Sequence, residues 1–479
     1  MSRMRHAILL AIVAALALTA PAGATTTGPG VQHLHYRLGP LHITPGQNTI
    51  DFAPTNLKPK VPGYITRFKP NIVREDGSVP QVDVIHLHHG VWVLGGGILS
   101  AVGEEKTIVS LPSHYGFRYT PNDPLLVNYM LHNLTSNPDT VYIEWDLDFV
   151  PDSSPVAKHM KPIRMQWMDV AGFRAYPVFD VHRGDGRNGR FTFPDDRPND
   201  PAAGPSQRWI VDKPTTLVYT GGHVHPGGLS TYLTVTRGTR TVRIFTSRAK
   251  YYGPPTTWDM SMYVTPNNWR VKVLPGDIVK IHTVYDSKVA SWYEVMGISP
   301  IATTLDAGNG RDPFTQKIPQ KGRLTHGELP ENRSIGGLDA GLPDPEKMVD
   351  GPVSNTRLGI DGFVYGQGDL SNEGLPARPA VVHQGQALTF FNGDAQKNIF
   401  HTITSCKAPC NRSTGIGYPL ANGPVDFDSG ELGFGPKNFT AAANRDTWTI
   451  PNTLSPGTYT YFCRIHPFMR GSFRVVPNA

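Results

Sequence analysis

Short runs of apolar and β-branched residues, separated by turn residues, follow one another along most of this chain. Examples are 240-RTVRIFTS-247 and 270-RVKVLPGDIVKIHTVY-285, where apolar and polar side chains alternate over short stretches. Alternation with a period of two is typical of strands with one buried face, and helical periodicity is scarce. Gly (49) and Pro (44) are abundant between the runs. The pattern therefore predicts an all-β protein built from β-sandwiches.

Changes in this pattern divide the chain into five segments. We expect a signal peptide at 1–24, a β-sandwich at 25–155, a second at 156–300, a linker or wrapping segment at 301–358 and a third β-sandwich at 359–479. The first two sandwiches are expected to be jelly-roll-like. After removal of the signal about 455 residues remain (479 minus 24), which is too long for one ordinary core.

The N-terminus has the pattern of an export signal. Arg3 and Arg5 precede an apolar run at 7–20, and the small residues 22-AGA-24 form a cleavage site. No later stretch is long and apolar enough to span a bilayer. The mature chain is therefore predicted to be periplasmic or secreted, without a membrane span.

Charge excludes one class of partner. The formal net charge is +6, but the basic residues are scattered rather than gathered into a stripe. Nucleic-acid binding is therefore not expected.

Only three cysteines are present, and all lie late in the chain. Cys406 and Cys410 are close enough in sequence to form a small disulfide loop in an oxidising compartment. Cys463 is then an unpaired thiol, which in an exported protein calls for a chemical role.

The segment 461-YFCRIHPFM-469 indicates that role. Cys463, His466 and Met469 are clustered in it, and His401 is the obvious candidate for a second histidine. Two histidines and a cysteine with a weak axial methionine are the ligands of blue (type 1) copper. The competing interpretation is that Cys463 is simply a small buried residue and that Met469 fills the core. That interpretation leaves the clustering of four suitable ligands unexplained.

This segment resembles the cupredoxins, and its Cys-x₂-His-x₂-Met spacing is most similar to amicyanin. The resemblance covers about 120 residues and implies a Greek-key β-sandwich at 359–479. Multicopper oxidases instead flank the type 1 cysteine with histidines. Phe462 and Arg464 flank Cys463 here, so a laccase-like function is disfavoured.

Six histidines form two further groups in the first 300 residues: His86, His88, His89 and His132, and then His223 and His225. His223 and His225 alternate in a strand-like segment and should point to the same face. Histidines alone suit zinc as well as copper, whereas histidine with methionine favours copper. The grouping predicts metal sites in this half of the chain.

The order of these residues resembles the copper type II, ascorbate-dependent monooxygenases, which include the peptidylglycine- and dopamine-hydroxylating enzymes. The related stress-upregulated nodulins are a second similar group. The matching segments are 88-HHG-90, 111-LPSHYGFRY-119 with 125-LLVNYMLHN-133, 223-HVH-225, and 275-PGDIVKIHTVYDS-287 with 293-YEVMG-297. The resemblance implies one electron-transfer copper on His88, His89 and His132. It implies a second, oxygen-binding copper on His223, His225 and Met296. His86 is a possible additional ligand.

Two departures limit this resemblance. The position four after Met296 is Pro300, where peptide-hydroxylating members have a tyrosine, and this half of the chain contains no cysteine. Recognition of a peptide is therefore not implied.

The function expected from the sequence is that of an exported, copper-dependent monooxygenase. It would use three copper ions, O₂, an organic substrate and an external electron donor, with the cupredoxin as the electron-entry module. The alternatives are a non-catalytic periplasmic copper-binding or electron-transfer protein, and a copper reductase or oxidase acting on nitrite or O₂.

Overall fold

The structure of the chain is a computed structural model. It describes residues 25–26, 30–82, 84–135, 137–172, 177–200, 203–252, 258–288, 291–305, 307–325, 344–352, 356–370, 378–397, 399–406, 426–434, 444–466 and 468–478. The predicted signal peptide at 1–24 lies outside these residues. Among the described residues, no helix is long and apolar enough to cross a membrane.

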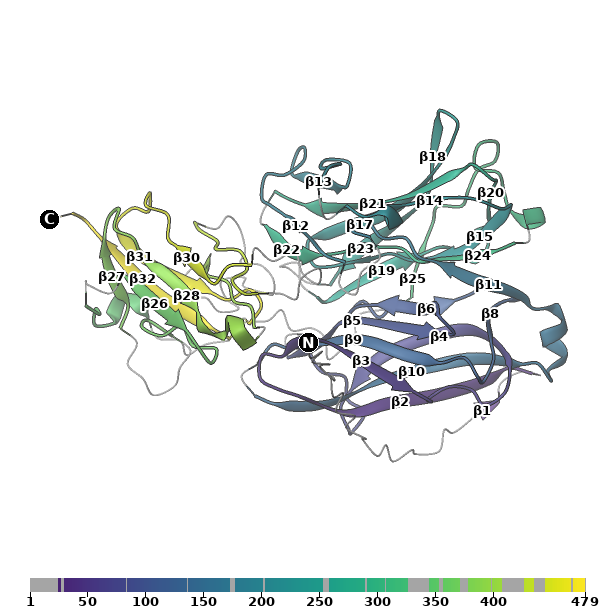
Figure 1. Cartoon of the computed structure of the whole chain (residues 1–479), viewed down its shortest axis with the longest axis horizontal. Helices are drawn as coiled ribbons and strands as arrows, with labels where there is room; N and C mark the ends of the chain where they lie inside the picture. Colours follow the sequence, from purple (N-terminus) through teal and green to yellow (C-terminus); the bar gives the residue numbers. More distant parts are fainter. Residues whose placement is uncertain are drawn as a thin grey trace, which may run out of the picture.

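The described residues form an all-β protein with three large hydrophobic cores in chain order and a fourth, smaller cluster that contains Met130 and Met296 (Figure 1). The predicted fold class and the sandwich architecture are confirmed. Helical structure in the described part is limited to five short 3₁₀ segments: η1 (Pro155–His159), η2 (Pro205–Gln207), η3 (Ala307–Asn309), η4 (Pro345–Lys347) and η5 (Gly393–Lys397).

The first sandwich packs two sheets around a core that contains Phe68, Trp92 and Trp145. Its strands are β1 (Thr25–Thr26), β2 (Gln32–Ile43), β3 (Asn48–Thr55), β4 (Gly63–Val73), β5 (Ile85–Leu94), β6 (Gly97–Val102), β7 (Val109–Ser110), β8 (Tyr115–Tyr119), β9 (Leu125–Asn133) and β10 (Asp139–Pro151). One sheet has the order β3-β9-β5-β6. It carries four of the six histidines, so its outer face positions the site.

The second sandwich is joined to the first by one continuous sheet. Its strands are β11 (Lys161–Gln166), β12 (Phe179–Val181), β13 (Arg190–Phe193), β14 (Arg208–Ile210), β15 (Thr215–Thr220), β16 (His223–Val224), β17 (Gly228–Arg237), β18 (Arg240–Tyr251), β19 (Met260–Val264), β20 (Val271–Val273), β21 (Ile278–Asp286), β22 (Trp292–Val295), β23 (Gly297–Ile298), β24 (Ile301–Thr304) and β25 (Arg323–Leu324). Strand β11 pairs with β8 of the first sandwich and with β24 of the second. Strands β24 and β25 lie in the segment 301–358 and extend sheets of the second sandwich.

The third sandwich contains two small sheets, with the orders β26-β28-β30 and β27-β32-β31-β29. Its strands are β26 (Arg357–Ile360), β27 (Ala380–His383), β28 (Thr389–Asn392), β29 (Thr404–Cys406), β30 (Thr447–Thr449), β31 (Gly457–Phe462) and β32 (Arg470–Val476). Strand β31 ends at Phe462, immediately before the buried Cys463, so the predicted ligand loop lies between β31 and β32.

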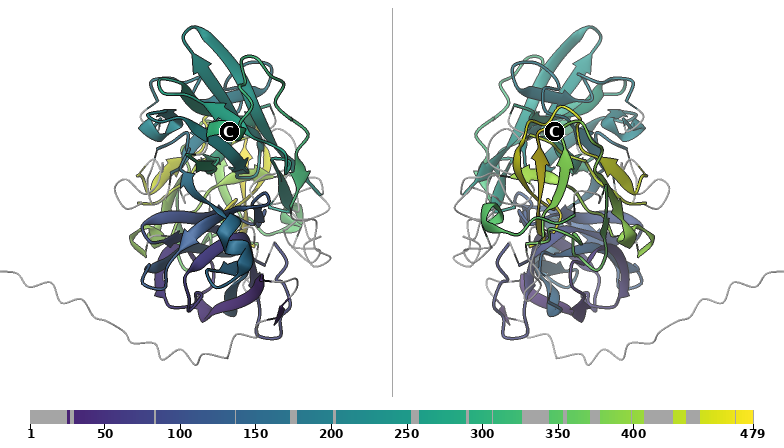
Figure 2. Two further views of the ribbon diagram at one scale, coloured as in Figure 1. Left: turned by 90° about the vertical axis from the view of Figure 1, so that its right-hand side faces the viewer. Right: turned by 90° about the vertical axis from the view of Figure 1, so that its left-hand side faces the viewer.

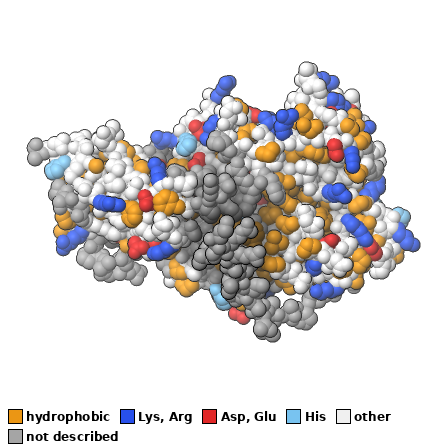
Figure 3. Space-filling view, viewed as in Figure 1, with side chains coloured by type: hydrophobic (Ala, Val, Ile, Leu, Met, Phe, Trp, Pro, Cys, Tyr) orange, Lys and Arg blue, Asp and Glu red, His pale blue; other side chains and the backbone are white. Residues whose placement is uncertain are grey.

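The third sandwich lies beside the seam between the other two. End-on views show it spanning both of its neighbours (Figure 2). Hydrogen bonds run from His466 to Gly46 of the first sandwich and from Arg464 to Ser291 of the second. On the face seen in Figure 3, Lys and Arg side chains are spread out rather than gathered into one stripe.

Candidate metal centres

Three buried ligand atoms converge at the end of β31. The His401 Nδ1 lies 3.9 Å from the Cys463 Sγ, the His466 Nδ1 lies 3.8 Å from that sulfur, and the two nitrogens are 3.3 Å apart. Donors bonded to one ion at about 2.0–2.3 Å in a trigonal plane would be roughly 3.5–3.7 Å apart. The triangle therefore has the dimensions of a His₂Cys metal site.

Hydrogen bonds to the outer ring nitrogens fix both imidazoles in this arrangement. The His401 Nε2 lies 3.1 Å from Asp394 Oδ2, and the His466 Nε2 lies 2.9 Å from the Gly46 carbonyl oxygen. Each Nε2–H donates to its oxygen, which leaves the Nδ1 of each ring on the side that faces Cys463, where it could bind a metal ion. Such outer partners set the tautomer of metal-ligating histidines.

The electrostatics favour a thiolate. Burial by itself raises the pKa of the Cys463 thiol, but the two imidazoles more than offset this and hold the pKa well below its usual range. The Thr402 and His466 backbone N–H groups also donate to the sulfur, each at 3.4 Å. Soft thiolate with two imidazoles is the donor set of blue copper, so these residues fit a copper ion.

Met469 lies in the same loop and is fully buried. Its N–H donates to the His466 carbonyl at 2.9 Å, and its own carbonyl accepts from the Cys463 N–H at 3.3 Å. The loop backbone therefore ties the predicted axial ligand to two of the other ligands.

A β-bulge in β5 places three histidines on one face. The pairing with β9 shifts between Leu87 and His89, so that His88 is the extra residue. Before the shift Leu87 faces the core, and after it Trp92 does. A simple strand would turn His88 and His89 to opposite faces, whereas a bulge re-aims the side chain. With the bulge, His86, His88 and His89 all lie on the outer face.

Together with His132 and the second sandwich, these residues form what we call the histidine cluster: His86, His88, His89, His132, His223 and His225. All six are buried. The ring centres of His88 and His225 are 4.7 Å apart and those of His86 and His132 are 5.0 Å apart. The Trp258 ring contacts this group, 4.7 Å from His86 and 4.8 Å from His225.

Burial keeps most of these imidazoles neutral. It lowers the pKa of His86 to about 3 and that of His89 to about 4, and it holds those of His88, His132 and His225 well below the usual range. The neutral imidazole is the metal-binding form.

Two residues orient the histidines of the second sandwich. The Glu105 carboxylate lies 3.1 Å from His223 Nδ1, and the Tyr285 hydroxyl accepts from the His225 N–H at 2.9 Å while donating to the Met296 carbonyl at 2.7 Å. The Nε2 atoms of His223 and His225 are buried and have no hydrogen-bond partner among the described residues. A buried imidazole nitrogen that no hydrogen bond satisfies is suited to coordinating a metal ion, so copper or zinc fits here.

The distances between the histidine ring centres group these residues differently from the two ligand sets that the resemblance implies. His88 is nearer to His225, at 4.7 Å, than to His132, at 6.1 Å, or to His89, at 6.3 Å. Within the described part of the chain, His401, Cys463 and His466 are the one group of three His, Cys, Asp or Glu residues whose ligand atoms all lie within 4.8 Å of one another. The two predicted N-terminal centres therefore form one continuous cluster in this structure.

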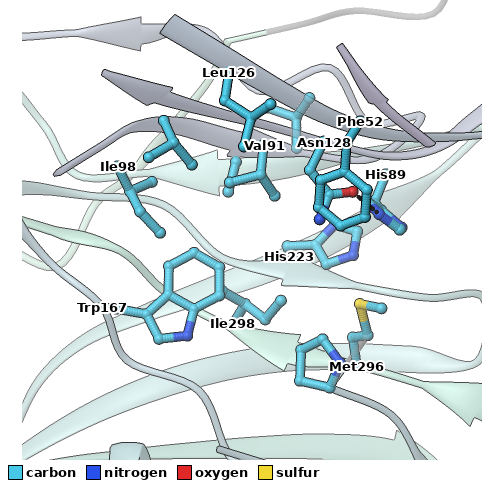
Figure 4. Close-up of a pocket in the computed structure, with 14 residues that line it drawn as sticks. Phe52, His89, Val91, Ile98, Leu126, Asn128, Trp167, His223, Met296 and Ile298 are labelled. Atoms are coloured by element: carbon cyan, nitrogen blue, oxygen red, sulfur yellow. Dashed lines mark hydrogen bonds between the residues drawn. The ribbon is translucent and has the colours of Figure 1, made fainter. Parts of the chain in front are cut away.

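A cavity of about 260 Å³ adjoins the cluster (Figure 4). His89, His223 and Met296 border it, and the other lining residues are Phe52, Val91, Val93, Ile98, Ala101, Val102, Leu126, Asn128, Trp167, Pro177 and Ile298. The walls come from the outer face of the β3-β9-β5-β6 sheet and from the second sandwich. The sequence alone gave no sign of this pocket beside Met296.

At the opposite side, the cluster touches the third sandwich. The His132 ring centre lies 5.8 Å from that of His466. One predicted ligand of the type 1 centre is thus in contact with one predicted ligand of the N-terminal centres.

The sequence interpretation missed several residues that shape these centres. These residues are Asp394, Glu105, Tyr285 and Trp258. They act through hydrogen bonds or ring contacts from distant parts of the chain, and no local sequence motif marks them. Of the predicted disulfide, Cys406 is disulfide-bonded, and Cys410 lies outside the described residues. Its pairing stays a prediction.

Comparisons with known proteins leave the family open. No family model matches this chain, and no curated protein does. Among solved structures, one match is the Cu-containing nitrite reductase (NirK) from Thermus scotoductus SA-01. It shares 15% sequence identity, covers 56% of this chain and 59% of its own, and has a TM-score of 0.16. The match spans less than two thirds of that chain and is too weak to assign a function, which therefore rests on the chemistry of the centres themselves.

Proposed function

We propose that this chain is an exported, copper-dependent oxidoreductase, and specifically a monooxygenase that hydroxylates a C–H bond of an organic substrate with O₂. One observation carries the proposal: the buried histidine cluster lies between the His401–Cys463–His466 centre and the cavity. His132 contacts His466 on one side, and His89 and His223 border the cavity on the other. In this order, the His401–Cys463–His466 centre would receive electrons, the histidine cluster would bind metal and the cavity would bind the substrate.

The reaction needs two electrons. One oxygen atom of O₂ enters the C–H bond, and the other leaves as water with two protons and two electrons from an external donor. Three copper ions would supply this redox chemistry: one at the His401–Cys463–His466 centre and two in the histidine cluster, whose ligands the resemblance divides into His88, His89 and His132 and into His223, His225 and Met296. A thioether favours Cu(I), the state that reacts with oxygen.

The residues of the chain supply position and environment. Glu105 orients His223, and Tyr285 ties the backbone of His225 to that of Met296. The apolar cavity walls limit water at the reacting carbon. His466 and His132 bring the electron-entry centre into contact with the cluster, so that no large movement of the third sandwich is required.

The other functions are less well supported. A purely electron-transferring protein has no need of a cavity beside its metal ligands. A reductase of a small anion such as nitrite has no need of a largely apolar cavity of about 260 Å³.

The proposal is tested by counting metal in the purified mature chain and by substituting Met296. We expect three coppers per chain, one with blue absorption and two of ordinary type 2 character. Met296→Leu keeps a similar volume but removes the thioether, so oxygen uptake with a one-electron donor should fall about 100-fold or more, as when a major transition-state interaction is removed. The blue absorption should persist.

Cys463→Ser is the matched control for the other centre. It should abolish the blue absorption while the N-terminal copper remains bound. A single copper per chain, or oxygen uptake unchanged in Met296→Leu, would overturn the monooxygenase proposal.

A further inference from the structure

The cavity has a floor and a rim of different character. His89, His223, Met296 and Ile298 are buried, whereas Val91, Ile98, Leu126 and Trp167 are only partly buried and Phe52 is 52% exposed. Figure 4 shows His223 and Met296 on one side and the apolar side chains of Val91, Ile98 and Leu126 around the rest. The cavity therefore leads from an apolar, solvent-reached rim to the predicted metal ligands.

The lining carries almost no polar groups. The exceptions among the described lining residues are His89, Asn128, His223 and the indole N–H of Trp167, and none of these described residues is Lys, Arg, Asp or Glu. The His89 Nε2 lies 3.0 Å from Asn128 Oδ1, and the His223 Nδ1 lies 3.1 Å from the Glu105 carboxylate. In the copper-free chain, an ionised group bound here would lose its hydration without gaining a charged partner among the described lining residues, so its binding is disfavoured.

The cavity volume sets the size of the occupant. A cavity of about 150 Å³ is large enough for benzene, which has six carbons. By proportion, about 260 Å³ accommodates a molecule of roughly ten carbons.

From these three features we infer that the substrate is a neutral, predominantly hydrocarbon molecule of about ten carbon atoms, bound with the reacting carbon toward His223 and Met296. The inference rests on the proposed function in treating the bound molecule as a substrate. The binding site itself rests on the cavity. Anionic peptides, sugar acids and inorganic anions do not fit this lining.

Binding to the copper-free, full-length mature chain tests the inference by calorimetry, without reference to activity. The probes are p-isopropyltoluene, a neutral ten-carbon hydrocarbon, and p-isopropylbenzoate, which has a carboxylate in place of one methyl group. We expect one hydrocarbon per chain with a dissociation constant of roughly tens of micromolar, the range for about ten well-packed atoms. The carboxylate should bind at least tenfold more weakly.

Two variants locate the site. Ala101 lines the cavity from β6 and is partly exposed, so Ala101→Phe should fill the space and weaken hydrocarbon binding about tenfold or more, an effect of at least 1.4 kcal/mol. Ala387→Phe, at an exposed position of the third sandwich, is the control and should bind as the unmodified chain does.

Leu126→Lys keeps the inference testable if the filled variant does not fold. It places a cation at the rim and should reverse the preference, so that p-isopropylbenzoate binds more tightly than the hydrocarbon. Loss of folding cannot mimic such a reversal. Equal binding of both probes to the unmodified chain, or hydrocarbon binding unaffected by Ala101→Phe, would overturn the inference.

The outcomes separate this inference from the proposed function. If the hydrocarbon binds but the chain holds one copper, the apolar site stands and the monooxygenase proposal fails. If oxygen uptake depends on Met296 but the hydrocarbon does not bind, the reaction class stands and the substrate class is wrong.

Discussion

At the scale of a single residue, Asp394 positions His401 in the His401–Cys463–His466 group, although it does not belong to that triangle. It accepts a hydrogen bond from His401 Nε2 and is itself held by the Gly362 N–H at 3.1 Å and by Lys397 at 2.9 Å. These bonds offset the effect of burial, and the pKa of the Asp394 carboxyl lies well below its usual value. The carboxylate therefore remains charged at neutral pH and keeps the imidazole aligned.

Asp394→Asn should weaken copper binding without abolishing the blue site. The amide is nearly the same size, but it loses the charge that orients His401 and makes it a better donor. Loss of such an outer partner typically costs 10–100-fold in metal affinity, so we expect a fall of about that size in a competitive copper titration. Asp361→Asn is the control, because Asp361 also contacts Lys397, at 3.2 Å, but is exposed. Equal affinities in the two variants would contradict the role given to Asp394.

At the scale of the element, the bulge in β5 places the side chains of His86, His88 and His89 on one face of the strand. The Leu87 N–H, next to the bulge, donates to Glu104 Oε2 at 2.9 Å, and Glu104 in turn pairs with Lys106 at 2.8 Å. All three residues are buried, so this carboxylate satisfies a backbone donor and a charge that water cannot reach.

Glu104→Ala should destabilise the first sandwich. It leaves the Lys106 charge and the Leu87 N–H buried without this partner, and breaking a buried pair typically costs about 3–5 kcal/mol. Urea unfolding of the metal-free chain measures the loss. The control is Glu144→Ala on β10, where the carboxylate lies 3.6 Å from the half-exposed His35, and the expected change there is below about 1 kcal/mol. A Glu104→Ala loss as small as that of the control would mean that the bulge does not depend on this contact.

The same element shows how far the sequence could predict the structure. Period-two alternation was enough for the all-β class and the sandwiches, because it depends only on which side of a strand is buried. The position of Met469 in the Cys463 loop also follows from adjacency in the chain. The bulge in β5 could not be predicted in this way. Its only trace in the sequence is the spacing of Leu87 and Trp92, which both face the core. The cavity and the junction of the histidines could not be predicted, because each is formed by two sandwiches whose contact depends on tertiary packing.

At the scale of the whole molecule, the third sandwich is docked against both others by contacts near its His401–Cys463–His466 group. The Arg464 guanidinium donates to the Ser291 carbonyl oxygen, lies 3.4 Å from Asp428 and sits 4.7 Å from the centre of the Tyr293 ring. His466 reaches the Gly46 carbonyl on the other sandwich. The contacts that fix the docking thus lie close to the junction between His466 and His132.

Tyr293→Ala should loosen this docking while leaving each sandwich folded. A cation–π contact contributes about 0.5–2 kcal/mol, so the docked arrangement should lose roughly tenfold in stability relative to separated sandwiches. Hydrogen exchange should rise in the Cys463–His466 loop, and electrons placed on the blue centre should reach the N-terminal copper more slowly, while the blue absorption is unchanged. Tyr232→Ala is the matched control, because Tyr232 makes the same kind of contact with Arg243, at 3.8 Å, within the second sandwich. If both variants transfer electrons at the rate of the unmodified chain, docking through Tyr293 does not limit transfer. The route from His466 to His132 would then need another anchor.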